Sequence, residues 1–398
     1  MKQRLLAACA GLAALALPMA GALAQDRIVA ASPNGSAAEP SCPQNDCLAP
    51  QLVYVGKEGA GGIDAARFDP RSGTISALGS VADIGRPTWL MPSPHRQVLY
   101  AANESANGGD GQGEVLSFTA DPADGHLSLL SRVGSGGGSP RHLALAGMPP
   151  TIFVANFAAA QVAAIPLQKG GALLPPTSVV TDSGSGSRLS EPHAQAVLAD
   201  REGKHLFVAD FGADRIFVYH IDADSHSLSP SAHPFAALPT GSGPRRLAFS
   251  ADGRFVYVLT EKAAQLVTLA WDAVREELRV IGSIPIVHSG KQAGIHAAEL
   301  VLDRDGRFAY VTNRGDGTLV VYALDRGTGT PREIQRLGSA GREPTALAID
   351  TTGRWLLVAS AAPGSVSVFA RNSDTGLIEP TPSRIAAPRA ASLAMLVP

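Results

Sequence analysis

Ionisable and amide side chains stand at matching ends of short apolar segments along this 398-residue chain. Those at or just before the start of a segment are Arg141, His193, Gln195, Arg245, His296 and Arg389. Those that follow the end of a segment are Glu104, Glu261 and Arg314. Histidine and glutamate can move protons in general acid–base catalysis, and arginine can bind a developing oxyanion. Charges of both signs in one place suit a small anionic or polyhydroxy ligand better than an apolar one.

These side chains can act together only if a repeat brings their segments side by side. The stretch PRRLAFSADGRFVYVLT, from Pro244 to Thr260, is an apolar strand, an Asp-Gly turn and a second β-branched and aromatic strand. Comparable hairpins start at Pro87, Pro140, Pro192, His296 and Pro344. Each continues into a third strand, as in Asp214 to Asp222, Gly317 to Asp325 and Ser365 to Arg371, and then into a weaker fourth.

The repeat has a period of roughly 45 to 53 residues, the length of one four-stranded propeller blade. Six copies begin within the chain, and a seventh is split between its two ends. The C-terminal PRAASLAMLVP resembles a first strand without a second, and Gln51 to Lys57 a second strand without a first. We therefore predict an all-β, seven-bladed β-propeller over residues 51–398, closed by pairing of the N- and C-terminal strands.

In such a ring the first strand of each blade lies innermost. The loop into the first strand and the loop out of the second open on one face, around the mouth of the central channel. The polar residues named above are therefore expected at this mouth, although they are far apart in sequence.

Four stretches in this order resemble successive blades of the lactonase family, which contains 6-phosphogluconolactonase-like enzymes and carboxy-muconate cyclases. They are EPHAQAVLAD, DFGADRIFVYHID, GSGPRRLAFSADGRFVYVLTE and AAELVLDRDGRFAYVTNRGDGTLVVY. The resemblance implies a site of one histidine, two arginines and one glutamate at the channel mouth, which falls on His193, Arg245, Glu261 and Arg314. Two positions depart from the family pattern: Gln195 replaces the second histidine of a PHAH stretch, and Thr260 replaces an asparagine.

The resemblance implies a carboxylic-ester hydrolase that opens a sugar-acid lactone. Glu261 or His193 would activate water, Arg245 and Arg314 would bind the carbonyl oxygen or an anionic group, and His193 would protonate the leaving alkoxide. The same ion pairs in a structural ring, a non-catalytic propeller platform, and a carboxy-muconate-type cyclase remain as alternatives. Arg141, Gln195, His296 and Glu104 are weaker candidates for substrate binding, and Asp210 and Asp214 are expected to cap the DFGAD turn.

The N-terminus predicts export. Residues 1–24 have a basic start, a short apolar run and an Ala-Leu-Ala cleavage site, as in a secretory signal peptide, so we expect a periplasmic or secreted protein. Residues 25–50 are expected to be a flexible tether. Cys42 and Cys47 are expected to form a disulfide in an oxidising compartment, with a metal or redox pair as the alternative.

The composition and the motifs exclude several classes of partner and cofactor. The formal net charge is −2 and 17% of residues are charged, so no basic surface for nucleic acid is indicated. The sequence has no P-loop, dinucleotide-binding, HExxH or GxSxG motif. We expect a small-molecule lactone as the partner, no cofactor, no metal, no membrane anchor and a monomer.

Overall fold

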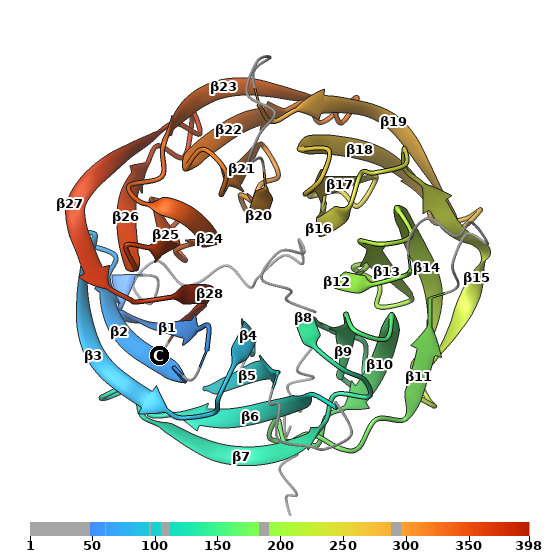
Figure 1. The fold of residues 1–398 in the computed structure, drawn as a ribbon, viewed down its shortest axis with the longest axis horizontal. Coiled ribbons are helices and arrows are strands. Elements are labelled where there is room, and N and C mark those ends of the chain that lie inside the picture. The colour runs from blue at the N-terminus through green and yellow to red at the C-terminus, as the bar shows by residue number, and fades with distance from the viewer. Residues whose placement is uncertain are drawn as a thin grey trace, which may run out of the picture.

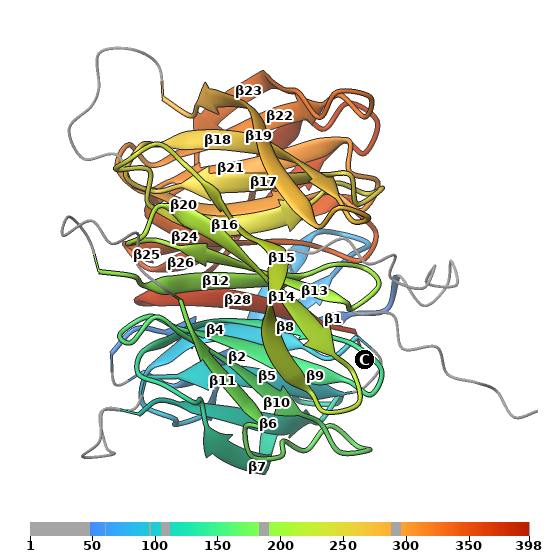
Figure 2. The same ribbon diagram turned by 90° about the vertical axis from the view of Figure 1, so that its right-hand side faces the viewer.

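The computed structural model describes residues 48–59, 61–94, 97–104, 112–182, 191–287 and 296–397. The described residues form 28 strands in seven four-stranded antiparallel sheets. Figure 1 shows the sheets as blades around a central axis, and Figure 2 shows strands running across the thickness of the ring. In the described part of the chain, no helix is long and apolar enough to cross a membrane.

The blades are numbered here in chain order, with strands given from the axis outward. Blade 1 comprises β28 (Ala390–Leu396), β1 (Gln51–Lys57), β2 (Ile63–Asp69) and β3 (Thr74–Ala82). Blade 2 comprises β4 (Pro87–Pro92), β5 (Val98–Asn103), β6 (Glu114–Ala120) and β7 (Leu127–Gly134). Blade 3 comprises β8 (Pro140–Ala146), β9 (Thr151–Asn156), β10 (Gln161–Pro166) and β11 (Ser178–Thr181).

The remaining blades follow the same order. Blade 4 comprises β12 (Ala194–Ala199), β13 (His205–Asp210), β14 (Arg215–Asp222) and β15 (Ser227–Ala237). Blade 5 comprises β16 (Pro244–Phe249), β17 (Phe255–Thr260), β18 (Gln265–Asp272) and β19 (Glu277–Pro285). Blade 6 comprises β20 (Ala297–Leu302), β21 (Phe308–Asn313), β22 (Thr318–Leu324) and β23 (Pro331–Gly338). Blade 7 comprises β24 (Arg342–Ile349), β25 (Trp355–Ala362), β26 (Ser365–Arg371) and β27 (Ile378–Ala386).

The ring closes through the two ends of the chain. Strand β1 pairs with β28 in antiparallel register, so that Val55 lies opposite Leu393. This pairing confirms the predicted split blade, and Figure 1 shows blue β1 beside red β28. The expected signal peptide, most of the expected tether, and both Cys42 and Cys47 lie outside the described residues.

The second strand of each blade lies within the core. Every residue of β5, β9, β13, β17 and β21 is buried, because neighbouring blades cover both faces of these strands. Between blades 4 and 5, the Phe207 ring meets Phe249 and Trp271 edge to face, with ring centroids 5.1 Å and 4.8 Å away. The fourth strands are mostly exposed, with one buried residue each in β7 and β19, as expected for an edge that meets water.

The packing between blades predicts a large effect at Phe207. Its side chain is fully buried, so Phe207→Ala leaves a cavity between two sheets and should lower the free energy of unfolding by about 3–5 kcal/mol. Urea unfolding followed by tryptophan fluorescence measures this change. Leu129→Ala on outer strand β7, where the side chain is 53% exposed, is the control and should change it by less than about 0.5 kcal/mol.

Candidate active site

A β-bulge recurs near the mouth end of the inner strands and sets the first ring of polar side chains. In blades 2 to 5 and 7 the pairing with the second strand skips one residue. The skipped residues are Thr88, Arg141, Gln195, Arg245 and Thr345. A bulged residue is released from the ladder and its side chain is re-aimed, which explains how these strands can turn polar groups toward the channel. In blade 1 the skipped residue is Ala391, and Arg389, which the hairpin alignment placed here, lies two residues earlier.

The second ring comes from residues that directly follow the second strands. Glu58, Glu104, Phe157, Phe211, Glu261 and Arg314 occupy this position in blades 1 to 6. The polar residue just before it ties down the neighbouring loop: Asn103 Oδ1 accepts the Arg86 N–H at 2.9 Å, and Asn313 Oδ1 accepts the His296 N–H at 3.3 Å. The loops at the mouth are therefore held by hydrogen bonds from the ends of buried strands.

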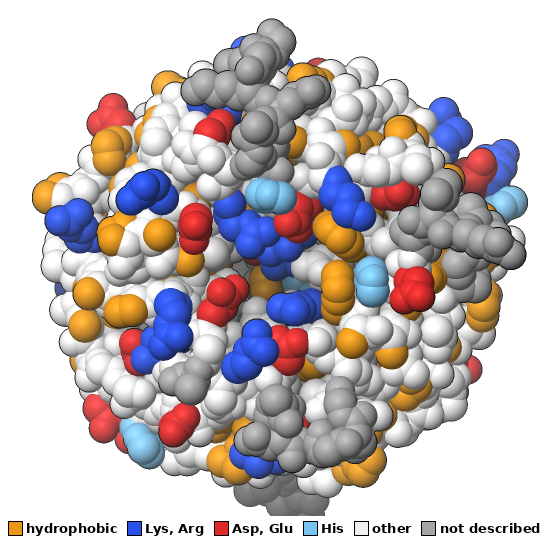
Figure 3. Space-filling view, in the orientation of Figure 1, with side chains coloured by type: hydrophobic (Ala, Val, Ile, Leu, Met, Phe, Trp, Pro, Cys, Tyr) orange, Lys and Arg blue, Asp and Glu red, His pale blue; other side chains and the backbone are white. Residues whose placement is uncertain are grey.

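Together these two rings line a cavity of about 280 Å³. The residues around it are Glu58, Arg86, Pro87, Thr88, Glu104, Arg141, Phe157, Gln195, Phe211, Arg245, Arg246, Glu261, Arg314 and Ala391. The arginines in this lining outnumber the glutamates, so the cavity favours an anionic or strongly polarised ligand. Figure 3 shows charged side chains of both signs gathered around the centre of this face.

Glu261 lies between two arginines. Arg245 Nη1 is 2.7 Å from Glu261 Oε2, and Arg314 Nη2 is 2.9 Å from Glu261 Oε1. His296 Nδ1 lies 3.6 Å from the same Oε1 on the exposed side. Burial favours the neutral acid, but the two guanidinium groups outweigh it and hold the pKa of Glu261 below its ordinary value. The carboxylate is therefore ionised at neutral pH and fixes the orientation of both arginines.

Arg245 is held at a second point. Its Nε donates to the Ala298 carbonyl oxygen at 2.8 Å, and its side chain is 17% exposed. Two cations around one carboxylate leave excess positive charge beside the cavity, which suits a carbonyl oxygen that becomes an oxyanion.

A looser group of charges lies across the mouth. Arg86 Nη2 and Arg141 Nη2 lie 3.4 Å and 3.6 Å from the two carboxylate oxygens of Glu104. The Ser139 hydroxyl donates a short hydrogen bond to Glu104. Both arginines are more exposed than Arg245, so their ion pairs with Glu104 are weaker and the arginines can turn toward a ligand.

His193 is positioned by blades 3 and 4. Its ring stacks on Phe157 with 4.4 Å between centroids and 7° between planes. Its Nδ1 lies 3.0 Å from the Phe157 carbonyl oxygen, which can only accept a hydrogen bond. The proton of the neutral ring is therefore on Nδ1, and Nε2 carries the lone pair.

Asp210 holds the backbone around His193. Its Oδ1 accepts the N–H groups of His193, Gly212 and Ala213 at 2.8, 3.0 and 2.7 Å. Asp214 accepts the N–H groups of Gly241 and Gly243, each at 2.7 Å. Asp210 therefore caps the turn that follows its strand, as expected from the sequence, but Asp214 binds the loop that leads into β16 of blade 5 instead of that turn.

Arg246, which lines the cavity, forms a buried ion pair and packs on an aromatic ring. Arg246 Nε donates to both oxygens of Glu299 at 3.0 and 3.1 Å. Its guanidinium carbon lies 4.7 Å from the centroid of Trp89, on the inner strand of blade 2, so the side chain spans the channel. Trp89 in turn packs on His142 at 4.2 Å between centroids. Burial and nearby Arg246 hold the pKa of His142 well below its ordinary value, so this ring is neutral.

Most of the predicted residues meet at this cavity. Arg141, Gln195, Arg245, Glu104, Glu261 and Arg314 line it. His193 and His296 are not in the lining: the His193 ring stacks on Phe157, which is, and His296 is 59% exposed beside Glu261. Four further residues line the cavity and were not among the predicted ones: Phe157 and Phe211, which are apolar, and Arg86 and Arg246. Phe157 and Phe211 directly follow the second strands of their blades, as Glu104, Glu261 and Arg314 do in theirs. This shared position in the repeat could have identified the two phenylalanines from the sequence.

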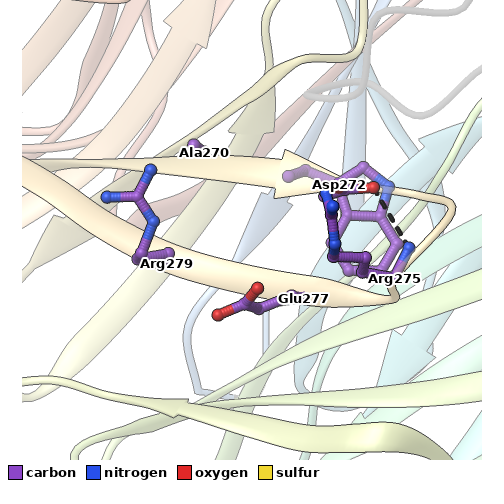
Figure 4. Close-up of a pocket in the computed structure, with 6 residues that line it drawn as sticks. Ala270, Asp272, Arg275, Glu277 and Arg279 are labelled. Atoms are coloured by element: carbon purple, nitrogen blue, oxygen red, sulfur yellow. Dashed lines mark hydrogen bonds and ion pairs between the residues drawn. The ribbon is translucent and has the colours of Figure 1, made fainter.

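A second hollow of about 310 Å³ lies away from the axis, between β18 and β19 of blade 5. Figure 4 shows its residues on the two strands and their turn, with the Asp272–Arg275 ion pair at 2.7 Å. This hollow contains none of the predicted residues, and its charges are paired within the turn or exposed.

Comparison with known proteins gives consistent matches over nearly the whole described chain. Residues 53–395 match the family described as lactonase, seven-bladed β-propeller. The 6-phosphogluconolactonase of Bacillus subtilis is 26% identical over 342 residues, which cover 85% of this chain and 96% of that protein. The structure of the periplasmic gluconolactonase of Pseudomonas aeruginosa is 32% identical with a TM-score of 0.81, and the match covers 88% of this chain and all of that one.

Proposed function

We propose that this chain, which belongs to the seven-bladed β-propeller lactonase family and is a lactone hydrolase, acts outside the cytoplasm on an unphosphorylated sugar-acid lactone. The observation that carries the proposal is the Arg245–Glu261–Arg314 group beside a small polar cavity. The similar gluconolactonase is periplasmic by its description, and the N-terminal sequence has the features of a signal peptide. Both support an exported enzyme.

The substrate class follows from the lining. A lactone ring that carries several hydroxyl groups needs donors and acceptors around it, and the cavity offers Glu58, Glu104, Thr88 and Gln195. Phe157 and Phe211 provide apolar surface for the C–H faces of a sugar ring.

Hydrolysis begins with a proton transfer. We assign the base to Nε2 of His193, because Nδ1 is committed to the Phe157 carbonyl oxygen. Nε2 takes a proton from water, and the hydroxide oxygen attacks the lactone carbonyl carbon. Glu261 is a poorer base, because both of its oxygens already accept guanidinium N–H groups and its pKa is lowered.

Collapse of the tetrahedral intermediate opens the ring. Arg245 and Arg314 hold the oxyanion while it exists, and the C–O bond to the ring oxygen then breaks. The imidazolium of His193 returns its proton to the leaving alkoxide. The product is the open-chain acid, which releases one proton to solvent.

The test is hydrolysis of gluconolactone, galactonolactone and 6-phosphogluconolactone by the purified chain, followed with a pH indicator and corrected for spontaneous hydrolysis. We expect the unphosphorylated rings to react faster. Arg245→Ala should lower kcat/KM by about 10²- to 10³-fold, because one oxyanion donor is lost.

Arg275→Ala is the matched control, since that arginine is exposed in the outer hollow of blade 5. It should leave kcat/KM unchanged. Preference for the phosphorylated ring would refute the substrate class but keep the site. Unchanged turnover in Arg245→Ala would refute the site.

A further inference from the structure

Two histidines and a glutamate converge at the outer boundary of blades 4 and 5, far from the cavity. His205 is the first residue of β13, and His220 is its cross-strand partner on β14. Glu276 lies in the turn between β18 and β19, and Figure 4 includes this turn. Strand β13 ends near the mouth at Asp210, so His205 lies at the opposite end of that strand, about 17 Å away.

The three side chains present ligand atoms at close range. His220 Nε2 is 3.0 Å and His205 Nε2 is 3.7 Å from Glu276 Oε1. All three atoms lie within 4.8 Å of one another. Around one tetrahedral Zn²⁺ with bonds of about 2.0–2.1 Å, ligand atoms are about 3.3 Å apart, so little movement is needed to enclose an ion.

The buried nitrogen of His205 requires an explanation. Its side chain is 7% exposed, and its Nδ1 lies 2.6 Å from Asp200 Oδ2, so Nδ1 donates the hydrogen bond. Nε2 is buried and has no hydrogen-bond partner. A distance of 3.7 Å to Glu276 is too long for a hydrogen bond, so a proton on Nε2 would have no acceptor in range, and a lone pair there would face the carboxylate. A cation between the two atoms would satisfy both groups.

Asp200 and Trp271 fix the orientation of the His205 ring, as neighbouring residues commonly do for a metal-binding histidine. A carboxylate on the far nitrogen of a ligating histidine fixes its tautomer and raises its basicity. Asp200 is itself held, because its Oδ1 accepts the N–H groups of Lys204 and His205 at 2.7 and 3.1 Å. The Trp271 ring packs edge to face on His205 with 5.1 Å between centroids.

The position of Glu276 is unusual among the blades. It follows the turn aspartate Asp272 by four residues and has a φ of +55°. At the same distance from the corresponding turn residue, four other blades have glycine, namely Gly73, Gly125, Gly329 and Gly376. A side chain is disfavoured in this left-handed conformation, so glycine would suit the turn better. Glu276 Oε2 accepts the Ala232 N–H at 3.0 Å, and this bond directs Oε1 to the histidines.

We propose that His205, His220 and Glu276 form a binding site for a divalent transition-metal cation such as Zn²⁺. Two imidazoles and a carboxylate are a ligand set that zinc accepts, and a fourth position remains for water. The ligands come from blades 4 and 5, so the ion links two neighbouring blades. The site is remote from the cavity and does not depend on the proposed lactonase reaction.

The test is isothermal titration of the tag-free, chelator-treated chain with ZnCl₂, with Co²⁺ absorption as a report on coordination geometry. We expect one Zn²⁺ per chain at this site, a tetrahedral Co²⁺ spectrum and a rise in Tm with Zn²⁺. Glu276→Gly should fold normally, because it restores the residue that suits the turn, yet lose at least about tenfold in Zn²⁺ affinity. Asp200→Asn should weaken binding by about 10- to 100-fold.

Matched variants separate this site from adventitious binding by other groups. His220→Gln removes a half-exposed ligand without disturbing the core and should also lose the tetrahedral Co²⁺ spectrum. His226→Gly changes the equivalent turn position of blade 4 and should leave Zn²⁺ affinity unchanged. The proposal is overturned if the unaltered chain binds no Zn²⁺, or if Glu276→Gly and His220→Gln bind it as tightly as the unaltered chain.

Discussion

Replacement of His193 by glutamine is expected to lower kcat for lactone hydrolysis by about 10²- to 10⁴-fold, the usual contribution of a positioned general base. Glutamine is close in size and can still donate to the Phe157 carbonyl oxygen, but it cannot take a proton from water. Because His193 is half-buried at the edge of the mouth, the substitution should leave the unfolding midpoint in urea nearly unchanged. Steady-state hydrolysis of the preferred lactone across pH 5 to 9 measures the effect.

His233→Gln, on the exposed outer strand β15, is the matched control and should retain full activity. The shape of the pH profile adds a second criterion. If His193 is the base, the rise of kcat/KM with pH that reports its deprotonation in the free enzyme should be absent from the residual activity of His193→Gln. Retained kcat with an unaltered pH profile in this variant would remove His193 from the mechanism.

The fold could be predicted from local signals alone. Hairpins of about 17 residues, such as Pro244 to Thr260, pair two apolar strands and repeat often enough to count the blades. Closure of the ring could also be predicted, because Gln51–Lys57 and the C-terminal segment each lacked one partner strand in the repeat. Both features depend on neighbours in sequence or on a simple repeat.

The site was only partly predictable, because its geometry depends on bulges and on contacts across the channel. The hairpin alignment found Arg141, Gln195 and Arg245, whose blades share one bulge pattern. It misplaced the blade 1 position on Arg389, since the split blade has no hairpin turn to fix its register.

Contacts between distant blades left no signal in the repeat. Arg246 spans the channel to Trp89, and neither residue has a spacing that indicates the other. The ligands His205, His220 and Glu276 come from three separated segments, so no spacing motif marks them and the sequence led us to expect no metal. Such clusters become visible only when the packing of neighbouring blades is known.

Glu261→Gln is expected to lower kcat/KM by about 10²- to 10³-fold, although Glu261 is not assigned as the base. The carboxylate accepts from Arg245 at 2.7 Å and from Arg314 at 2.9 Å, and a neutral amide cannot balance or orient two guanidinium groups. The released arginines should also bind the product acid more tightly. Product inhibition measured with the free sugar acid would then strengthen in the variant. Glu277→Gln, on outer strand β19, should change neither quantity.

The lowered pKa of Glu261 adds a dependence of stability on pH. The folded protein holds this pKa below that of the unfolded chain, about 4.3, so Glu261 contributes stability that is fully present above the unfolded pKa. That contribution is lost as the pH falls through the lower, folded pKa. The free energy of unfolding should therefore decrease from pH 5 downward more steeply in the unaltered chain than in Glu261→Gln, as urea titrations at each pH would measure. Parallel curves would mean that the ion pairs of Glu261 with Arg245 and Arg314 do not form in solution. That result would contradict the proposed oxyanion site.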